Sequence, residues 1–177
     1  LAIAQLFDYY PDIASIDILA HSMGGLVSRG AINFLPPESQ LKINNYITLS
    51  TPWEGHAGAA LGVEWSPAIA PVWYSMAPKS GYIEALYEQG LASNINHHMV
   101  FTYARKLNGK GASDDGVVST ASQLSPRAQR DVTALYALRD NHNGSLRSSC
   151  IVELVQALIV NWCVVKYLFN GKAVQFT

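Results

Sequence analysis

The chain has 177 residues, 49% of them hydrophobic and 14% charged, which is typical of one packed globular domain and not of a disordered segment. The formal net charge is −1, from 12 Lys and Arg against 13 Asp and Glu, and no run of like charges exceeds two residues. This composition argues against a nucleic-acid-binding surface or a polybasic membrane patch, so we expect no nucleic-acid partner.

The first third of the chain has the pattern of helices alternating with strands. The expected elements, in chain order, are a helix over residues 1–10, a strand over 15–20, a helix over 26–34 and a strand over 43–49. We expect Pro36 and Pro37 to end the second helix. A strand, a helix and a strand in succession predict an α/β fold, in which a right-handed crossover joins strands of a mostly parallel sheet.

The rest of the chain continues this pattern after a long insertion. Residues 53–96 are too many for a simple connection and too apolar to be disordered, which indicates a cap or lid. The elements expected after it are a strand over 99–103, a short helix over 122–130, a strand over 132–138 and a closing helix over 150–169. The sheet is therefore expected to be flanked by helices.

The closing helix has about the length of a membrane span. Its apolar residues fall on one stripe, however, and polar residues interrupt it at Glu153, Gln156, Asn161 and Lys166. We therefore predict a helix that packs on the sheet, and no transmembrane segment.

The two cysteines do not indicate a disulfide or a metal site. Cys150 and Cys163 are expected on one helix, where their spacing of 13 residues corresponds to about 20 Å. A disulfide requires Cα atoms within about 7 Å, and a zinc site requires Cys and His at closer spacing. We expect no metal and no cofactor. For the cellular compartment, the sequence weakly favours a cytoplasmic location.

The strongest chemical signal is the segment Ala20-His21-Ser22-Met23-Gly24-Gly25, between an apolar strand and a helix. Acyl-transfer enzymes hold their serine on a sharp strand-to-helix turn, with small residues two positions before and after it. Here those positions hold Ala20 and Gly24. The turn predicts Ser22 as a nucleophile and the backbone N–H of Met23 as an oxyanion donor. The alternative is an ordinary turn with a capping serine.

A serine nucleophile needs a base, and the base needs an orienting acid. In hydrolases with such a turn the partners follow in the chain order Ser, acid, His. Only His142 follows a plausible acid loop, and it lies in a loop of its own. His21 is expected to point elsewhere, and the remaining histidines precede the acid loop: His56, His97 and His98. The alternative for His142 is an ordinary surface histidine.

For the acid we choose Asp115, in a polar turn expected just after a strand. Gly116, which follows it, allows the tight bend that would aim the carboxylate at His142. Asp114 is a rival that is better suited to capping the turn. Asp140 is a second rival, but it lies so close to His142 in the chain that it would have to bend back on itself.

Three segments of the chain resemble a known family. They are Ala20 to Gly25, Ser50 to His56 (S-T-P-W-E-G-H) and Asp115 to Val118 (D-G-V-V). They are similar to the α/β-hydrolase lipases and serine esterases, and most similar to the group related to GPI-inositol deacylases. The resemblance runs from about Ser15 to the closing helix.

The resemblance implies an α/β-hydrolase fold in which Asp115 and His142 complete the triad. It also implies that the first strands and the loop with the second oxyanion donor would precede Leu1. The chain, 1–177, is then expected to be the C-terminal portion of a single α/β-hydrolase domain, with a cap or lid over 53–96. Glu54 stands where many members have a smaller residue.

The aromatic insertion indicates an apolar substrate. We expect Trp53, Trp73 and Met76 to line an acyl pocket or lid above Ser22, the alternative being that they only pack the insertion on the sheet. The prediction is a serine hydrolase that cleaves acyl esters of lipids or small molecules through an acyl-enzyme. An acyltransferase with the same site and a non-catalytic binding relative are the alternative functions.

Overall fold

The computed structural model describes residues 2–59, 71–104 and 113–160. In this part of the chain a four-stranded sheet has the order β1-β2-β3-β4, and each neighbouring pair of strands is parallel. The strands are β1 (Ile16–His21), β2 (Ile43–Leu49), β3 (Asn96–Thr102) and β4 (Ala134–Leu138). The four predicted strands are therefore present, and β2 has the predicted bounds.

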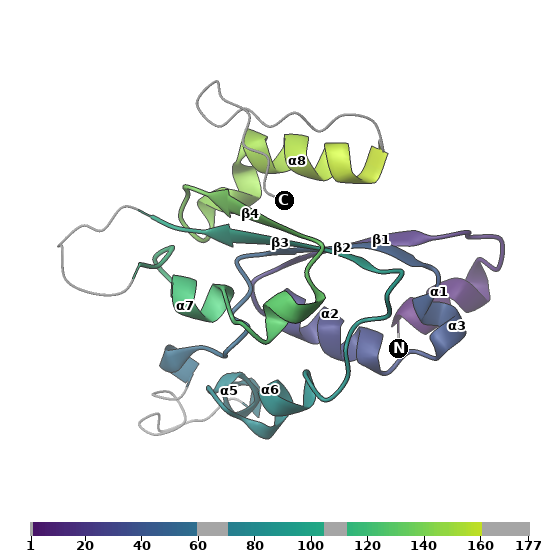
Figure 1. Cartoon of the computed structure of the whole chain (residues 1–177), viewed down its shortest axis with the longest axis horizontal. Helices are drawn as coiled ribbons and strands as arrows, with labels where there is room; N and C mark the ends of the chain where they lie inside the picture. Colours follow the sequence, from purple (N-terminus) through teal and green to yellow (C-terminus); the bar gives the residue numbers. More distant parts are fainter. Residues whose placement is uncertain (1, 60–70, 105–112, 161–177) are drawn as a thin grey trace.

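Helices cover both faces of the sheet (Figure 1). One face carries α8 (Ser149–Val160), and the opposite face carries α2 (Met23–Asn33) together with most of the other helices. The remaining elements are α1 (Ala2–Tyr9), α3 (Pro37–Gln40), α5 (Pro71–Met76), α6 (Gly81–Ala85), α7 (Thr120–Gln123), and the 3-10 turns η1 (Ala128–Asp131) and η2 (Gly144–Arg147). A parallel sheet between two helical layers confirms the predicted α/β class.

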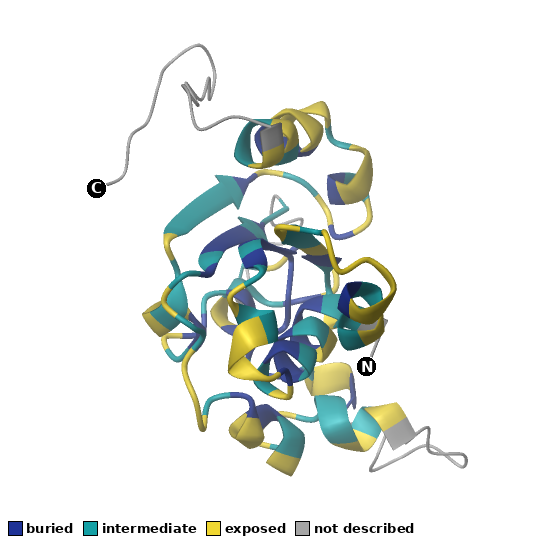
Figure 2. Cartoon of the chain, turned by 90° about the vertical axis from the view of Figure 1, so that its right-hand side faces the viewer, coloured by how far each residue is buried: buried dark blue, intermediate teal, exposed yellow. Residues whose placement is uncertain are grey.

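The two faces of the sheet bury separate apolar clusters, because successive side chains of a strand point to opposite faces. On β2, Tyr46 belongs to the cluster beside α2, whereas Ile47 belongs to the cluster beside α8. Most residues of the central strands β2 and β3 are buried, whereas most residues of the outer strands β1 and β4 are half-buried (Figure 2). Each buried Leu or Ile side chain stabilises the fold by about 1.5–3 kcal/mol, which fixes the register of the strands.

The second helix ends before the two prolines that were expected to stop it. Its last residue is Asn33, and Pro37 is the first residue of α3. Proline is tolerated there because the first N–H groups of a helix have no intrahelical acceptor. The helix also begins earlier than predicted, at Met23 instead of Leu26, since the chain turns directly from Ser22 into α2.

The predicted helix over 122–130 is wrong. The structure has two short segments instead, since α7 ends at Gln123 and η1 begins at Ala128. Pro126 provides the physical reason, because a proline disfavours helical backbone in the residue before it and cannot donate a helical hydrogen bond.

The closing helix packs on the sheet as predicted, with Ile151 and Leu154 buried against it. The predicted continuation over 161–169, and with it Cys163, lies outside the described residues. Within the described ranges no helix has the length and apolar character needed to cross a bilayer. Those ranges also contain no cluster of three or more His, Cys, Asp or Glu side chains suited to a metal ion.

The carboxyl ends of the four parallel strands meet at one edge of the sheet. Ser22 follows β1 directly, and Ser50 follows β2. Asp115 lies in the connection after β3, and His142 lies in the one after β4. Ligands of open parallel α/β sheets bind at this edge, so the fold alone brings the predicted site residues to one place.

Candidate active site

Ser22 occupies a strained turn between β1 and α2. Its backbone has φ 55° and ψ −131°, a conformation that L-residues rarely adopt and that costs about 1–3 kcal/mol. The N–H of Ser22 donates to the carbonyl of Leu49 at 2.8 Å, which ties the turn to the end of β2. The turn therefore holds the half-buried serine at the carboxyl edge of the sheet.

Small residues allow this turn to lie close to its neighbours. A Cβ added to Gly24 would lie 3.9 Å from the Cβ of Ala20, an ordinary contact that explains why alanine is small enough at position 20. A Cβ added to Gly25 would overlap the side chain of Thr51. Gly25 is therefore required by the close approach of α2 to the segment after β2, which sequence analysis did not single out.

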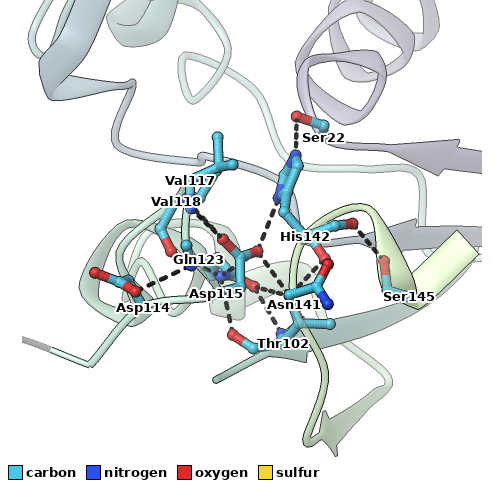
Figure 3. A network of polar contacts seen from close by, with 12 residues as sticks. Ser22, Thr102, Asp114, Asp115, Val117, Val118, Gln123, Asn141, His142 and Ser145 are labelled. Atoms are coloured by element: carbon cyan, nitrogen blue, oxygen red, sulfur yellow. Dashed lines mark hydrogen bonds and ion pairs between the residues drawn. The ribbon is translucent and has the colours of Figure 1, made fainter. Parts of the chain in front are cut away.

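The structure brings Ser22, His142 and Asp115 into one hydrogen-bonded chain (Figure 3). The Nε2 atom of His142 lies 2.9 Å from Ser22 Oγ, and its Nδ1 atom lies 2.8 Å from Asp115 Oδ2. The loop that carries His142 is held on both sides, because the N–H of His142 donates to the Asp115 carbonyl and Ser145 Oγ donates to the His142 carbonyl. His142 is thus a buried histidine, not a surface one.

Asp115 is completely buried, and both of its carboxylate oxygens accept hydrogen bonds. Oδ1 accepts the N–H groups of Val117 at 3.0 Å and Val118 at 2.7 Å. Burial by itself would raise the pKa of Asp115, but the hydrogen bonds from His142 and the other donors outweigh it and lower the pKa to about 2. The carboxylate is therefore ionised at neutral pH and can orient and stabilise a protonated His142.

The two rival acids cap local turns instead. Asp114 is exposed, and its Oδ1 accepts the N–H of Gly116 at 3.0 Å. The Oδ1 of Asp140 accepts the N–H of Asn141 at 2.8 Å. Among the three acids considered, the structure places Asp115 against the imidazole of His142.

His21 lies against His142, contrary to the expectation that it points elsewhere. Its Nε2 donates to the His142 carbonyl at 3.0 Å, and the two rings are 4.7 Å apart between centroids. Burial is the main cause that lowers the pKa of His21, which favours the neutral ring. Sequence analysis missed this contact because it joins residues that are far apart in the chain.

The other histidines serve the packing of strands and loops. His56 Nε2 lies 2.8 Å from the carbonyl of Val117 and so links the loop after β2 to the Asp115 loop. His97 is fully buried and stacks on Tyr46 with a centroid distance of 4.8 Å. Burial lowers the pKa of His97 to about 3, so its ring is neutral at physiological pH. His98 on β3 is also buried.

Met23 is the first residue of α2, directly after Ser22. The first N–H groups of a helix have no intrahelical acceptor, and the helix dipole makes this end favourable for negative charge. An oxyanion donor requires these properties. That the Met23 N–H donates to the oxyanion is a proposal that rests on them.

The aromatic residues of the insertion differ in their environment. Trp53 is only 1% exposed and packs edge-on against His97, which favours the alternative that it packs the insertion on the sheet. Its contact with substrate stays a prediction. Trp53 lies four positions after the last residue of β2 and belongs to the same buried cluster as Ile83 of α6. Trp73 and Met76 lie on α5 and are half-buried, which leaves their contact with substrate as a prediction.

Glu54 has a structural role beside the site. Its carboxylate forms an ion pair with Arg127 at 2.7 Å and accepts a hydrogen bond from Ser125. Arg127 also pairs with Glu84 on α6 at 2.7 Å and lies over the ring of Tyr87. Glu54 therefore ties the loop after β2 to the neighbouring segments, and its charge is neutralised by Arg127.

This fold, a parallel sheet with a strained strand–serine–helix turn at its carboxyl edge, is the α/β-hydrolase fold. The family model described as the PGAP1-like alpha/beta domain matches residues 1–67, which contain the Ser22 turn and β2. The predicted resemblance to α/β-hydrolase serine esterases is therefore supported by an independent comparison.

Solved structures of lipolytic enzymes have the same fold. Lipase BlEst2 of Bacillus licheniformis in its propeptide form is 16% identical, with a TM-score of 0.62 over 99% of this chain and 40% of that chain. Its mature form is 17% identical, with a TM-score of 0.53 over 82% of this chain and 67% of that chain. Phospholipase PlaB of Legionella pneumophila is 19% identical, with a TM-score of 0.52 over 69% of this chain and 32% of that chain. No curated protein matches the chain.

Proposed function

We propose that this protein hydrolyses carboxylic esters of lipids or small molecules through an acyl-enzyme on Ser22. The observation that carries the proposal is the chain of hydrogen bonds from Ser22 Oγ through His142 to the buried Asp115, with distances of 2.9 and 2.8 Å. The names of the similar structures, a lipase and a phospholipase, support an acyl ester as the substrate class.

In the first half-reaction, His142 acts as the general base. Because the Asp115 carboxylate accepts the proton on Nδ1, the lone pair of His142 lies on Nε2 and faces the hydroxyl of Ser22. Nε2 takes the hydroxyl proton while Ser22 Oγ attacks the ester carbonyl carbon. The imidazolium then gives this proton to the departing alcohol, which leaves the acyl group on Ser22.

Charge develops at two places in this step, and each has a group to stabilise it. The carbonyl oxygen becomes an oxyanion beside the N-terminus of α2, where the Met23 N–H is one donor. The imidazolium of His142 is stabilised by the ionised Asp115. In the second half-reaction His142 activates a water molecule, which attacks the acyl-enzyme and releases the acid.

The decisive experiment is labelling of the protein with a fluorophosphonate probe, followed by peptide mapping. We expect the probe on Ser22, and we expect Ser22→Ala to lose both labelling and hydrolysis of p-nitrophenyl esters by several orders of magnitude. Ser93→Ala is the matched control, because Ser93 is an exposed serine in a loop. Labelling at another serine, or near-normal turnover of Ser22→Ala, would contradict the proposal.

A further inference from the structure

We propose that Gln123, together with Thr102, is a positioning residue that fixes the Asp115 carboxylate against His142 and shares its negative charge. The proposal rests on the proposed function, because it takes Asp115 as the acid that orients His142. Neither Gln123 nor Thr102 was singled out by sequence analysis, and both lie next to Asp115 in Figure 3.

Gln123 is the last residue of α7, and its side chain is 1% exposed. Its Oε1 accepts the N–H of Thr102 at 2.8 Å. Its Nε2 lies 3.2 Å from Asp115 Oδ2 and 3.1 Å from the carbonyls of both Thr102 and Val118. The opposite orientation of the amide would face its oxygen toward three acceptors, so these partners fix which end donates to Asp115.

Thr102 is the last residue of β3 and is fully buried. Its Oγ1 lies 2.7 Å from Asp115 Oδ2 and 2.7 Å from Ser50 Oγ. An ionised carboxylate only accepts hydrogen bonds, so Thr102 donates its proton to Asp115 and accepts the proton of Ser50. A buried relay therefore runs from Ser50 through Thr102 to the same oxygen that accepts the proton of His142.

The carboxylate of Asp115 is thus held at both oxygens. Oδ1 accepts two backbone N–H groups, and Oδ2 accepts from Thr102, Gln123 and His142. Rotation of the carboxylate would break several of these bonds at once, which keeps Oδ2 in line with Nδ1 of His142. The backbone donors alone hold only the oxygen that does not face His142.

The two neutral donors also lower the basicity of Oδ2, because they stabilise the charged carboxylate. Without them the carboxylate attracts the imidazolium form of His142 more strongly. The acid limb of the activity profile is then expected at a higher pH. A shift of the pH profile distinguishes a positioning role from a purely structural one. A loosened core would lower the amount of folded enzyme by the same factor at each pH and would leave the profile in place.

The test is the pH profile of kcat/KM for p-nitrophenyl ester hydrolysis by Gln123→Met, which keeps the length of the side chain and removes its hydrogen bonds. We expect kcat to fall by about 10- to 100-fold, with KM little changed, and the acid limb to move to higher pH. Gln129→Met is the matched control, because Gln129 is exposed and its side chain donates a hydrogen bond to the carbonyl of Leu124, away from Asp115. An unchanged kcat, or an acid limb that stays in place or moves to lower pH, would overturn the proposal.

A second pair of variants keeps the test decisive if Gln123→Met does not fold. Thr102→Ser retains the hydroxyl and is expected to keep the acid limb at the pH of the parent protein. Thr102→Val loses the hydroxyl and is expected to show the same shift of the acid limb as Gln123→Met. Equal profiles for the two variants would overturn the role of Thr102. Fluorophosphonate labelling of the parent protein separates the two proposals. If Ser22 is not labelled, both the proposed function and the positioning role are refuted. If Ser22 is labelled normally but the acid limb of the variants does not shift, only the positioning role is refuted.

Discussion

Replacing Asp115 with asparagine should remove nearly all activity, because five donors surround a side chain that would then have only one acceptor oxygen. Two are the backbone N–H groups of Val117 and Val118, and the others belong to Thr102, Gln123 and His142. If the amide oxygen keeps the two backbone donors, its NH2 group faces His142 Nδ1. That nitrogen must then accept a hydrogen bond, so the proton of the neutral ring lies on Nε2.

A proton on Nε2 disables His142 as a base, because this nitrogen faces Ser22. A loss of about 10⁴ in kcat is the precedent for such a change of tautomer, which corresponds to about 5 kcal/mol in the activation free energy. The fold is weakened as well. The pKa of Asp115 is about 2, against an ordinary value of 3.8, so loss of the ionised carboxylate costs about 2 kcal/mol of unfolding free energy.

The assay compares Asp115→Asn with Asp114→Asn in steady-state hydrolysis of p-nitrophenyl esters and in denaturant unfolding. Asp114 is exposed and caps a turn through the N–H of Gly116, so its variant should retain near-normal kcat and lose little stability. Small and equal effects at the two positions would refute the reasoning, as would a large loss of kcat in Asp140→Asn.

Two further predictions concern stability. Gly25→Ala should lower the unfolding free energy by about 1–3 kcal/mol, because the new Cβ overlaps a threonine of the segment after β2. Gly81→Ala is the control and should not destabilise the fold, because no atom lies within 4 Å of its new Cβ. Equal denaturation midpoints for the two variants would contradict this packing argument. The second concerns His97, whose pKa is about 3 in the folded protein against an ordinary value of 6.5, because burial disfavours the charged ring. The unfolded chain therefore binds the additional proton first, and stability should be full above pH 6.5 and fall toward pH 3 by up to about 1.4 kcal/mol per pH unit. Unfolding measured between these pH values should show this slope, and His97→Leu should flatten it; a variant with the parent slope would refute the assignment.

The order of the secondary structure could be predicted because it depends on local patterns. Short apolar runs bounded by turn residues located the four strands, and β2 has the predicted bounds. The prediction failed over 122–130, where Pro126 divides a helical pattern into two short pieces. It also left open whether Trp53 lines a substrate pocket or packs the core, because an aromatic side chain has the same sequence pattern in both places; the structure shows Trp53 buried.

The sequence by itself determined the Ser22 turn, since a strand, a serine between small residues and a helix all lie within a few consecutive positions. It also named Asp115 and His142 as candidates from chain order and turn chemistry. Only the tertiary structure decided that they meet, because 120 positions separate Ser22 from His142 and 27 separate His142 from Asp115. The parallel sheet closes these distances by bringing the carboxyl ends of its strands to one edge. The same holds for the contacts that no pattern indicates, such as Gln123 next to Asp115 and His21 beside His142, because the burial of a polar side chain depends on partners that come from distant parts of the chain.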